Sequence, residues 1–331
     1  MALSDWTPHA LLPRLRHDEA ARQDFVFALR GHLSRHVMPG VYRRYERRAE
    51  PRFRREHGRP PRDAREVREL LERDDYYRFW SALQRRSQEL LWEAVIDPTE
   101  RELPRLVARA RATRRARGSL RLNPKLAVPR YQTAADIHLQ PGGYHTEFVA
   151  GDVSAGALYD RALYLYSLGA LGPENGALGE LLLQYYRDRY PNAMPRRLLD
   201  MGCGIGNSLL PWARAFPRCE AHGIDIGAPM LRYAHARAAA LGAALHFSQQ
   251  NAEQTDFPSG SFDLVVSHLL LHETSRSALP RILAECHRLL RPGGVMLHLE
   301  VPRGVTPVEK FIYNWEVYNN NETFGQFLTD W

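Results

Sequence analysis

The spacing of apolar side chains divides the chain near residue 176. Between residues 18 and 117, apolar positions recur every three or four residues, the period of an amphipathic helix. Phe25, Leu29 and Leu33, for example, fall on one face of a predicted helix. Because Pro and Gly interrupt helices, we expect a break at Pro39 and a new helix beginning at Pro98. The predicted helices cover residues 18–37, 41–57, 64–96 (as one long helix or two consecutive helices) and 98–117.

Beyond residue 176, short apolar runs alternate with helical patterns. The predicted strands cover residues 197–201, 221–225, 245–249, 262–267 and 294–300, and the predicted helices cover 176–190, 207–216, 228–241 and 275–290. This alternation predicts an α/β fold, in which right-handed crossovers join the strands of a doubly wound parallel sheet.

Residues 118–169, between these two regions, are rich in Pro, Gly, His and Tyr and have no clear period. Long irregular segments in compact proteins are often lids or linkers. We therefore expect an all-helical N-terminal cap domain over residues 1–130, a linker or lid over 131–175, and the sheet domain over 176–331. We also expect residues 118–169 to lie over the carboxyl ends of the strands, where open parallel sheets bind their ligands.

Composition adds limits on location. The chain has 331 residues, of which 44% are hydrophobic and 25% are charged, as expected for a protein with a substantial core. It contains no apolar run of the roughly 18 residues that a membrane span needs, and its first residues do not resemble a secretory signal. Cys203, Cys219 and Cys286 lack paired spacing, which favours free thiols and a cytoplasmic location.

The net charge of +7 is unevenly distributed. Residues 1–130 hold 30 of the 45 Lys and Arg residues and 18 of the 38 Asp and Glu residues, so this part carries +12 and the remainder −5. A basic region can bind nucleic acid, but here acids alternate with arginines in a way that suits ion pairs on exposed helices. We expect no nucleic-acid partner.

The strongest chemical motif is "LLDMGCGIG", at a predicted strand-to-helix turn. Gly202, Gly204 and Gly206 would let the backbone approach a ligand, and a helix N-terminus offers free N–H groups. The spacing G-x-G-x-G differs from the G-x-G-x-x-G of dinucleotide sites, and Asp200 before it would repel a pyrophosphate. The loop therefore leaves a dinucleotide and a nucleoside sulfonium as candidate ligands.

Three later motifs decide between these ligands. Asp225 ends the second predicted strand in "GIDIGAPML", where a carboxylate can accept hydrogen bonds from ribose hydroxyls. Asn251 follows the third strand in "NAEQTDFPSGSFDLVVS", and "LRPGG" leads into the fifth. With these four motifs in order, residues 176–300 resemble the class I S-adenosylmethionine-dependent methyltransferases, and among them the group that includes ubiquinone and menaquinone methyltransferases.

The resemblance implies a Rossmann-like sheet, S-adenosylmethionine as methyl donor or as substrate, and no metal. It implies roles for the following cofactor-binding residues: Asp200, Gly202, Gly204 and Gly206 around the methionine part, Asp225 on the ribose, Ile226 and Met230 near the adenine, Asn251 and Ala252 at the adenine edge, and Ser267 with His268 beside the sulfonium. Two features depart from the family pattern. Asn251 replaces the usual Asp, and the region after residue 305 has room for a helix but not for the family's C-terminal strand hairpin, which we expect to be absent.

Candidate catalytic residues follow the fourth strand or lie in the irregular segment. His268 and His272 are four residues apart beside Glu273, but no third metal ligand is evident, so we consider a histidine general base rather than a metal site. Tyr144 and His145 either line the substrate pocket or pack within the lid. Aromatic side chains nearby would also suit a cationic sulfonium.

The predicted function is methyl transfer from S-adenosylmethionine to a small molecule in biosynthetic metabolism. Three alternatives remain. The chain could be a cyclase in which the cofactor's own amino group attacks its methionine chain, giving azetidine-2-carboxylate and methylthioadenosine. It could be an RNA or protein methyltransferase that uses the Arg-rich N-terminal region, or a binder without catalysis. The expected partner is a small-molecule substrate, with a homodimer left open.

Overall fold

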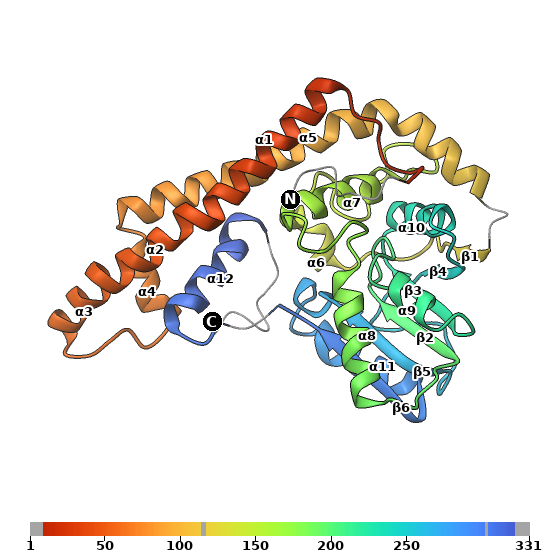
Figure 1. Cartoon of the computed structure of the whole chain (residues 1–331). Coiled ribbons are helices and arrows are strands. Elements are labelled where there is room, and N and C mark those ends of the chain that lie inside the picture. Colours follow the sequence, from red (N-terminus) through yellow and green to blue (C-terminus); the bar gives the residue numbers. More distant parts are fainter. Residues whose placement is uncertain (1–8, 114–116, 302–303, 322–331) are drawn as a thin grey trace.

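The computed structural model describes residues 9–113, 117–301 and 304–321. Figure 1 shows two parts, a sheet flanked by helices and a long arm of helices above it. We call residues 17–112, from the start of α1 to the end of α5, the helical arm. Among the described residues, no helix is long and apolar enough to cross a membrane.

Within the described residues, the sheet has six strands, all parallel, in the order β1-β4-β3-β2-β5-β6. The chain adds β3 and β4 on one side of β2, then crosses to add β5 and β6 on the other, so the predicted doubly wound topology is confirmed. The predicted strands correspond to β2 (Arg197–Met201), β3 (Glu220–Asp225), β4 (Leu245–Gln249), β5 (Phe262–His268) and β6 (Leu290–Leu299).

The strand β1 (Gly118–Arg121) lies in a region predicted to have no strand. It pairs with β4, with Gly118 opposite Leu245. Gly118 has φ +94°, and a Cβ atom there would lie 2.2 Å from the Leu245 carbonyl oxygen, so this close approach requires glycine. The helical region therefore ends before residue 118, and the sheet begins with a strand contributed from the N-terminal side.

Helices cover both faces of the sheet. On one face, Leu198 and Leu264 pack against α8 (Ala177–Arg189), α9 (Leu210–Ala215) and α10 (Ala228–Ala240). On the other face, Leu199 and Val265 pack against α11 (Ala278–Leu289). Neighbouring residues on a strand point to opposite faces, which explains why these strands are apolar throughout.

The arm begins with a helix that runs through two prolines. Pro39 was predicted to break it, but the helix continues because wider π turns precede the prolines and leave room for their rings. The hydroxyl of Tyr76 donates to the Val37 carbonyl at 2.9 Å, and Gly40 is small enough to lie against the Tyr76 ring. The segments are α1 (His17–His32), η2 (Leu33–Val37), α2 (Met38–Arg44), η3 (Tyr45–Ala49) and α3 (Glu50–His57).

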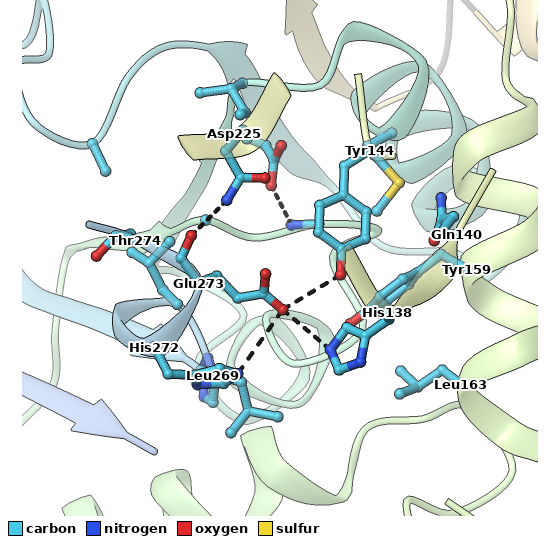
Figure 2. A pocket seen from close by; sticks show the side chains of 18 of the residues that line it. His138, Gln140, Tyr144, Tyr159, Leu163, Asp225, Leu269, His272, Glu273 and Thr274 are labelled. Atoms are coloured by element: carbon cyan, nitrogen blue, oxygen red, sulfur yellow. Dashed lines mark hydrogen bonds and ion pairs between the residues drawn. The ribbon is translucent and has the colours of Figure 1, made fainter. Parts of the chain in front are cut away.

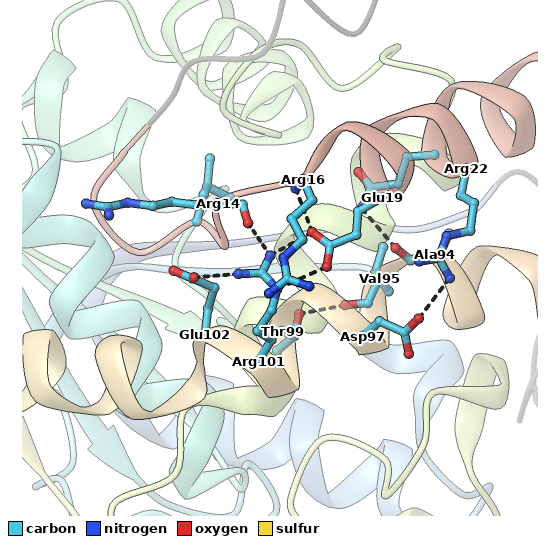
Figure 3. A network of polar contacts seen from close by, with 12 residues as sticks. Arg14, Arg16, Glu19, Arg22, Ala94, Val95, Asp97, Thr99, Arg101 and Glu102 are labelled. Carbon is cyan, nitrogen blue, oxygen red and sulfur yellow. Dashed lines mark hydrogen bonds and ion pairs between the residues drawn. The ribbon is translucent and has the colours of Figure 1, made fainter.

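After α4 (Ala64–Leu71), helix α5 (Asp75–Ala112) is also continuous, so the predicted helix start at Pro98 is wrong. A proline removes the hydrogen bond to the carbonyl four residues earlier, here that of Ala94. The side chain of Gln23, on α1, donates to this carbonyl at 3.0 Å. Close by, Glu19 of α1 accepts two hydrogen bonds from Arg101 of α5 (Figure 3). These contacts from α1 stabilise α5 at Pro98, where a proline would otherwise interrupt the helix.

Helix α12 (Pro307–Asn319) packs against the arm, although the sequence assigned residues 176–331 to the sheet domain. Trp315 is buried with its ring 5.4 Å from that of Trp80 on α5, and its indole N–H donates to Ser81. Figure 1 shows α12 beneath the arm. The shared core is formed by Val41, Tyr45, Val67, Leu71, Tyr77, Trp80, Phe311, Ile312 and Trp315.

The segment predicted to be irregular contains α6 (Arg130–Thr133), η5 (Ile137–Leu139) and the longer α7 (Ser154–Tyr166). Helix α7 packs between α5 and α10 and so joins the arm to the sheet. Its buried Asp160 accepts hydrogen bonds from Tyr233 and Arg237 on α10 and contacts His9 at 3.0 Å. Although burial opposes its charge, Arg237 and its other partners hold the pKa of Asp160 below its usual range.

Candidate active site

The glycine motif forms a loop at the carboxyl end of β2. Gly202, Gly204 and Gly206 have φ values of +70°, +52° and +71°, a region that other residues rarely adopt. A Cβ atom at Gly206 would lie 2.9 Å from the Phe247 ring, which shows that this glycine also permits close packing beneath the loop. The backbone of Gly202 and Gly204 faces a pocket at the carboxyl edge of the sheet.

Asp225, at the end of β3, holds this loop from the neighbouring strand. One carboxylate oxygen accepts from the backbone N–H of Gly204 at 3.0 Å, and the other accepts from Gly227 at 2.8 Å. Burial raises the pKa of Asp225, and the backbone donors oppose that rise. The backbone of Ile226 is a further donor to this carboxylate, and because the side chain lines the pocket, its remaining lone pairs can accept from a ligand.

Beneath the loop, Asp200 orients His268. Asp200 is 1% exposed, and its Oδ1 lies 3.3 Å from Nδ1 of His268 at the end of β5. The other ring nitrogen, Nε2, is buried and has no hydrogen-bond partner among the described residues. His268 lines the pocket, whereas the adjacent Ser267 is fully buried and contacts His298 at 2.7 Å.

A second carboxylate, Glu273, also lines the pocket and lies in η6 (Leu271–Glu273), just after β5. Its Oε1 accepts from the Tyr144 hydroxyl at 3.4 Å and lies 3.2 Å from Nε2 of His138. Nε2 of His272 is 3.9 Å away, and Nδ1 of the same ring contacts Glu300 at 2.6 Å. Figure 2 shows the Glu273 carboxylate surrounded by these three side chains.

The arm supplies the wall of the pocket that faces this cluster. On α5, the side chains of Gln88 and Trp92 both donate to the backbone carbonyl of His138, at 2.9 and 2.7 Å. His138 has φ +54°, so these bonds help to hold an unfavourable backbone conformation. The lining residues from α5, α7 and residues 131–144 are Gln88, Leu91, Trp92, Tyr131, Gln132, His138, Gln140, Tyr144, Tyr159, Ala162, Leu163 and Tyr166. Part of the segment 118–169, from Tyr131 to Tyr166, thus lines the pocket at the carboxyl edge of the sheet, whereas residues 118–121 form β1.

Comparison with known proteins identifies the sheet region. Residues 198–294 match a family model described as a methyltransferase domain. Residues 198–294 therefore form a methyltransferase domain of the class I, S-adenosylmethionine-dependent type. The predicted Rossmann-like fold with helices before it agrees with this assignment.

Individual relatives match about a third of the chain. A demethylmenaquinone methyltransferase of Thermus thermophilus is 33% identical over 108 residues, which are 33% of this chain and 48% of that protein. A malonyl-[acyl-carrier protein] O-methyltransferase of Methylococcus capsulatus is 36% identical over 118 residues, 35% of this chain and 41% of that protein. The match therefore spans about half or less of the length of these relatives.

Solved structures of other proteins are similar to part of the chain. A phosphoethanolamine N-methyltransferase 2 of Haemonchus contortus, solved with phosphomonomethylethanolamine and S-adenosylhomocysteine, has a TM-score of 0.40 at 22% identity. That likeness covers 48% of this chain and 38% of the other.

The pocket has the groups that S-adenosylmethionine requires. A loop with exposed backbone, a carboxylate with spare lone pairs at Asp225 and a side-chain amide at Asn251 suit its methionine, ribose and adenine parts. Aromatic rings on α7 and residues 131–144 suit its sulfonium. Among the described residues, no group of His, Cys, Asp or Glu side chains could hold a metal ion.

The structure separates the sequence-predicted site residues into two groups. Those that line the pocket are Gly202, Gly204, Asp225, Ile226, Met230, Asn251, Ala252, His268, His272 and Tyr144. Those that do not line it are Asp200, Gly206, Ser267 and His145. Asp200 instead contacts the lining residue His268, and Gly206 packs against Phe247 beneath the loop. His145 follows Tyr144 in the chain, and burial lowers its pKa.

Sequence reasoning gave no role to several residues of the methyltransferase pocket. Glu273 was noted only as a neighbour of His272, and its position at the centre of a polar cluster depends on His138, far away in the sequence. Gln88 and Trp92 looked like ordinary positions of an amphipathic helix. The one indication in the sequence was that Glu273 directly follows His272, shortly after the predicted strand 262–267.

Proposed function

We propose that this chain is a methyltransferase that transfers the methyl group of S-adenosylmethionine to a small molecule in biosynthetic metabolism. The observation that carries the proposal is the pocket itself. It joins the glycine loop and Asp225 at the carboxyl edge of the sheet to an aromatic wall contributed by α5 and α7. The domain match supports the cofactor, while the substrate class rests on the shape and charge of the pocket.

Specific residues would hold the cofactor, which supplies an electrophilic methyl group on a sulfonium. Asp225 would accept both ribose hydroxyls, and the backbone of Gly202 and Gly204 would contact the methionine part. Ile226, Met230, Asn251 and Ala252 would surround the adenine. The aromatic wall would exclude water and fix the orientation of the reacting groups, which together can lower the barrier substantially.

A small-molecule acceptor fits the pocket better than RNA. Phosphate recognition uses Arg and Lys, and neither residue type is found among the described residues that line the pocket, although the chain contains 45 of them. Arginines of the arm pair instead with neighbouring acids, as Arg52 does with Glu56 and Arg68 with Glu72. The basic charge of the arm is therefore already neutralised locally at these sites.

The test is incubation with S-adenosylmethionine, first alone and then with a panel of small acceptors that includes quinols, dicarboxylates, phenols and amines. We expect S-adenosylhomocysteine to form only when an acceptor is present. Methylthioadenosine formed without an acceptor would show cyclisation instead. Failure of the protein to bind S-adenosylmethionine in calorimetry would refute both reactions.

A further inference from the structure

The second carboxylate of the pocket, Glu273, is not one of the residues proposed to bind the cofactor. Its Oε1 contacts Tyr144 and His138, but its Oε2 is buried and has no hydrogen-bond partner among the described residues. A buried carboxylate oxygen without a partner is costly, and the cost falls when a ligand donates to it. The arrangement therefore provides an acceptor site for a hydrogen-bond donor from outside the protein.

The surroundings of Glu273 keep it charged. Burial would raise its pKa, but contacts with His138, His272 and Tyr144 outweigh burial, so the pKa of Glu273 lies below its ordinary value. Backbone contacts fix its position, because Gln132 donates to the Glu273 carbonyl at 2.6 Å. Glu300 accepts from the Leu271 N–H at 2.6 Å and contacts His272, which orients that ring towards Glu273.

The charges around the pocket are unusual for an arginine-rich protein. Asp225 and Glu273 line it, with three histidines, and among the described residues no Lys or Arg does. The buried Arg30 lies behind the wall, hydrogen-bonded to Gln88 and 4.8 Å from the ring centre of Tyr166. The wall facing Glu273 is aromatic, and aromatic faces attract cations. An anionic acceptor would meet two carboxylates and, within the described part of the chain, no Lys or Arg at the pocket surface.

From these observations we infer that the acceptor is a neutral or cationic molecule, and that it presents an N–H or O–H group to Oε2 of Glu273. This inference rests on the proposed function. In the reaction, the acceptor's N–H or O–H proton passes to Glu273, so the carboxylate acts as the general base; for a cationic ammonium acceptor this transfer comes first and frees the nitrogen lone pair. The acceptor's N or O lone pair forms the bond to the methyl carbon while the methyl–sulfur bond breaks and leaves its electron pair on sulfur. His272 and Glu300 are positioning residues that orient Glu273.

The first test measures binding without turnover. Benzylamine, benzyl alcohol and benzoate have similar shapes but carry positive, zero and negative charge, and their binding to the S-adenosylhomocysteine complex can be followed by ligand-observed NMR. We expect benzylamine and benzyl alcohol to bind at least tenfold more tightly than benzoate. In Glu273→Gln the preference for benzylamine over benzoate should shrink at least tenfold. Glu180→Gln, a change at an exposed glutamate of α8, is the matched control and should leave it unchanged.

The second test separates Glu273 from the cofactor site. Glu273→Gln should bind S-adenosylmethionine within threefold of the unaltered protein, while turnover of an acceptor found in the panel falls roughly 100-fold or more, the usual contribution of a general base. A tenfold loss of S-adenosylmethionine affinity would show that Glu273 holds the cofactor and would overturn the inference. Equal binding of benzoate and benzylamine, or unchanged turnover, would overturn it while leaving the proposed function intact.

Discussion

At the scale of single residues, Asp225 has two tasks, because it both positions the glycine loop and faces the pocket. We expect Asp225→Ala to weaken S-adenosylmethionine binding by roughly 2–4 kcal/mol, the value of two lost hydrogen bonds with a buried partner left unpaired. Calorimetry measures the change. Asp256→Asn, which alters an aspartate paired with Arg121 away from the pocket, is the control and should bind normally.

His222 links burial to pH. It lies in β3 with its ring 5.1 Å from that of His246, and burial lowers its pKa from 6.5 to about 4. In the unfolded chain His222 takes up a proton at higher pH than in the folded protein. Its contribution to folding stability is therefore fully present above pH 6.5 and is lost as the pH drops towards 4. Burial also lowers the pKa of His145, His235 and His298, which act in the same direction.

We therefore expect the free energy of unfolding to fall between pH 6.5 and pH 4, with His222 contributing about 2–3 kcal/mol. Urea titrations at several pH values measure this slope. The His222→Asn variant should have a shallower slope, whereas His287→Asn, at an exposed histidine, should not. Parallel slopes for the unaltered protein and His222→Asn would refute this role.

At the scale of elements, helix α1 supplies a hydrogen bond that helix α5 lacks at Pro98. Gln23 donates to the Ala94 carbonyl that Pro98 leaves without an intrahelical partner, and its Oε1 accepts from Arg161. We expect Gln23→Leu to destabilise the protein by about 1–3 kcal/mol. In a Pro98→Ala background the backbone N–H returns, so the same change should cost about 1 kcal/mol less.

Denaturant titration of the four proteins in this cycle measures the difference. The contact with Arg161 is lost in both backgrounds and cancels. Equal costs of Gln23→Leu in the two backgrounds would show that the Ala94 carbonyl needs no replacement donor.

The elements also show what sequence patterns can predict. The apolar runs of β2 to β5 predicted a parallel sheet because each strand is buried on both faces. The four-residue β1 has no such run, and its partner β4 is distant in the sequence, so its pairing depends on tertiary contacts. The helix through Pro98 was missed for the same reason, since Gln23 compensates from another element. Glu273 likewise gains its surroundings only when α5 brings His138 beside it.

At the scale of the whole molecule, α12 connects the end of the described chain to the arm. Trp315 is 1% exposed and packs on Trp80. We expect Trp315→Ala to lower the free energy of unfolding by about 3–5 kcal/mol, as for other buried large-to-small changes. Tyr313→Ala, at an exposed position of the same helix, should cost about 1 kcal/mol or less. Urea unfolding compares the two, and similar costs would contradict the packing role.

The position of α12 also has a consequence for how the chain is made. The arm emerges early in synthesis, yet Phe311, Ile312 and Trp315, which complete its core with Val67 and Trp80, are added only after the whole sheet region. At about 5–20 residues per second, this delay lasts roughly ten seconds or more. During that interval the apolar side of α4 and α5 is uncovered on the ribosome. A nascent chain of this protein is therefore open to aggregation or chaperone binding at a surface that the finished molecule hides.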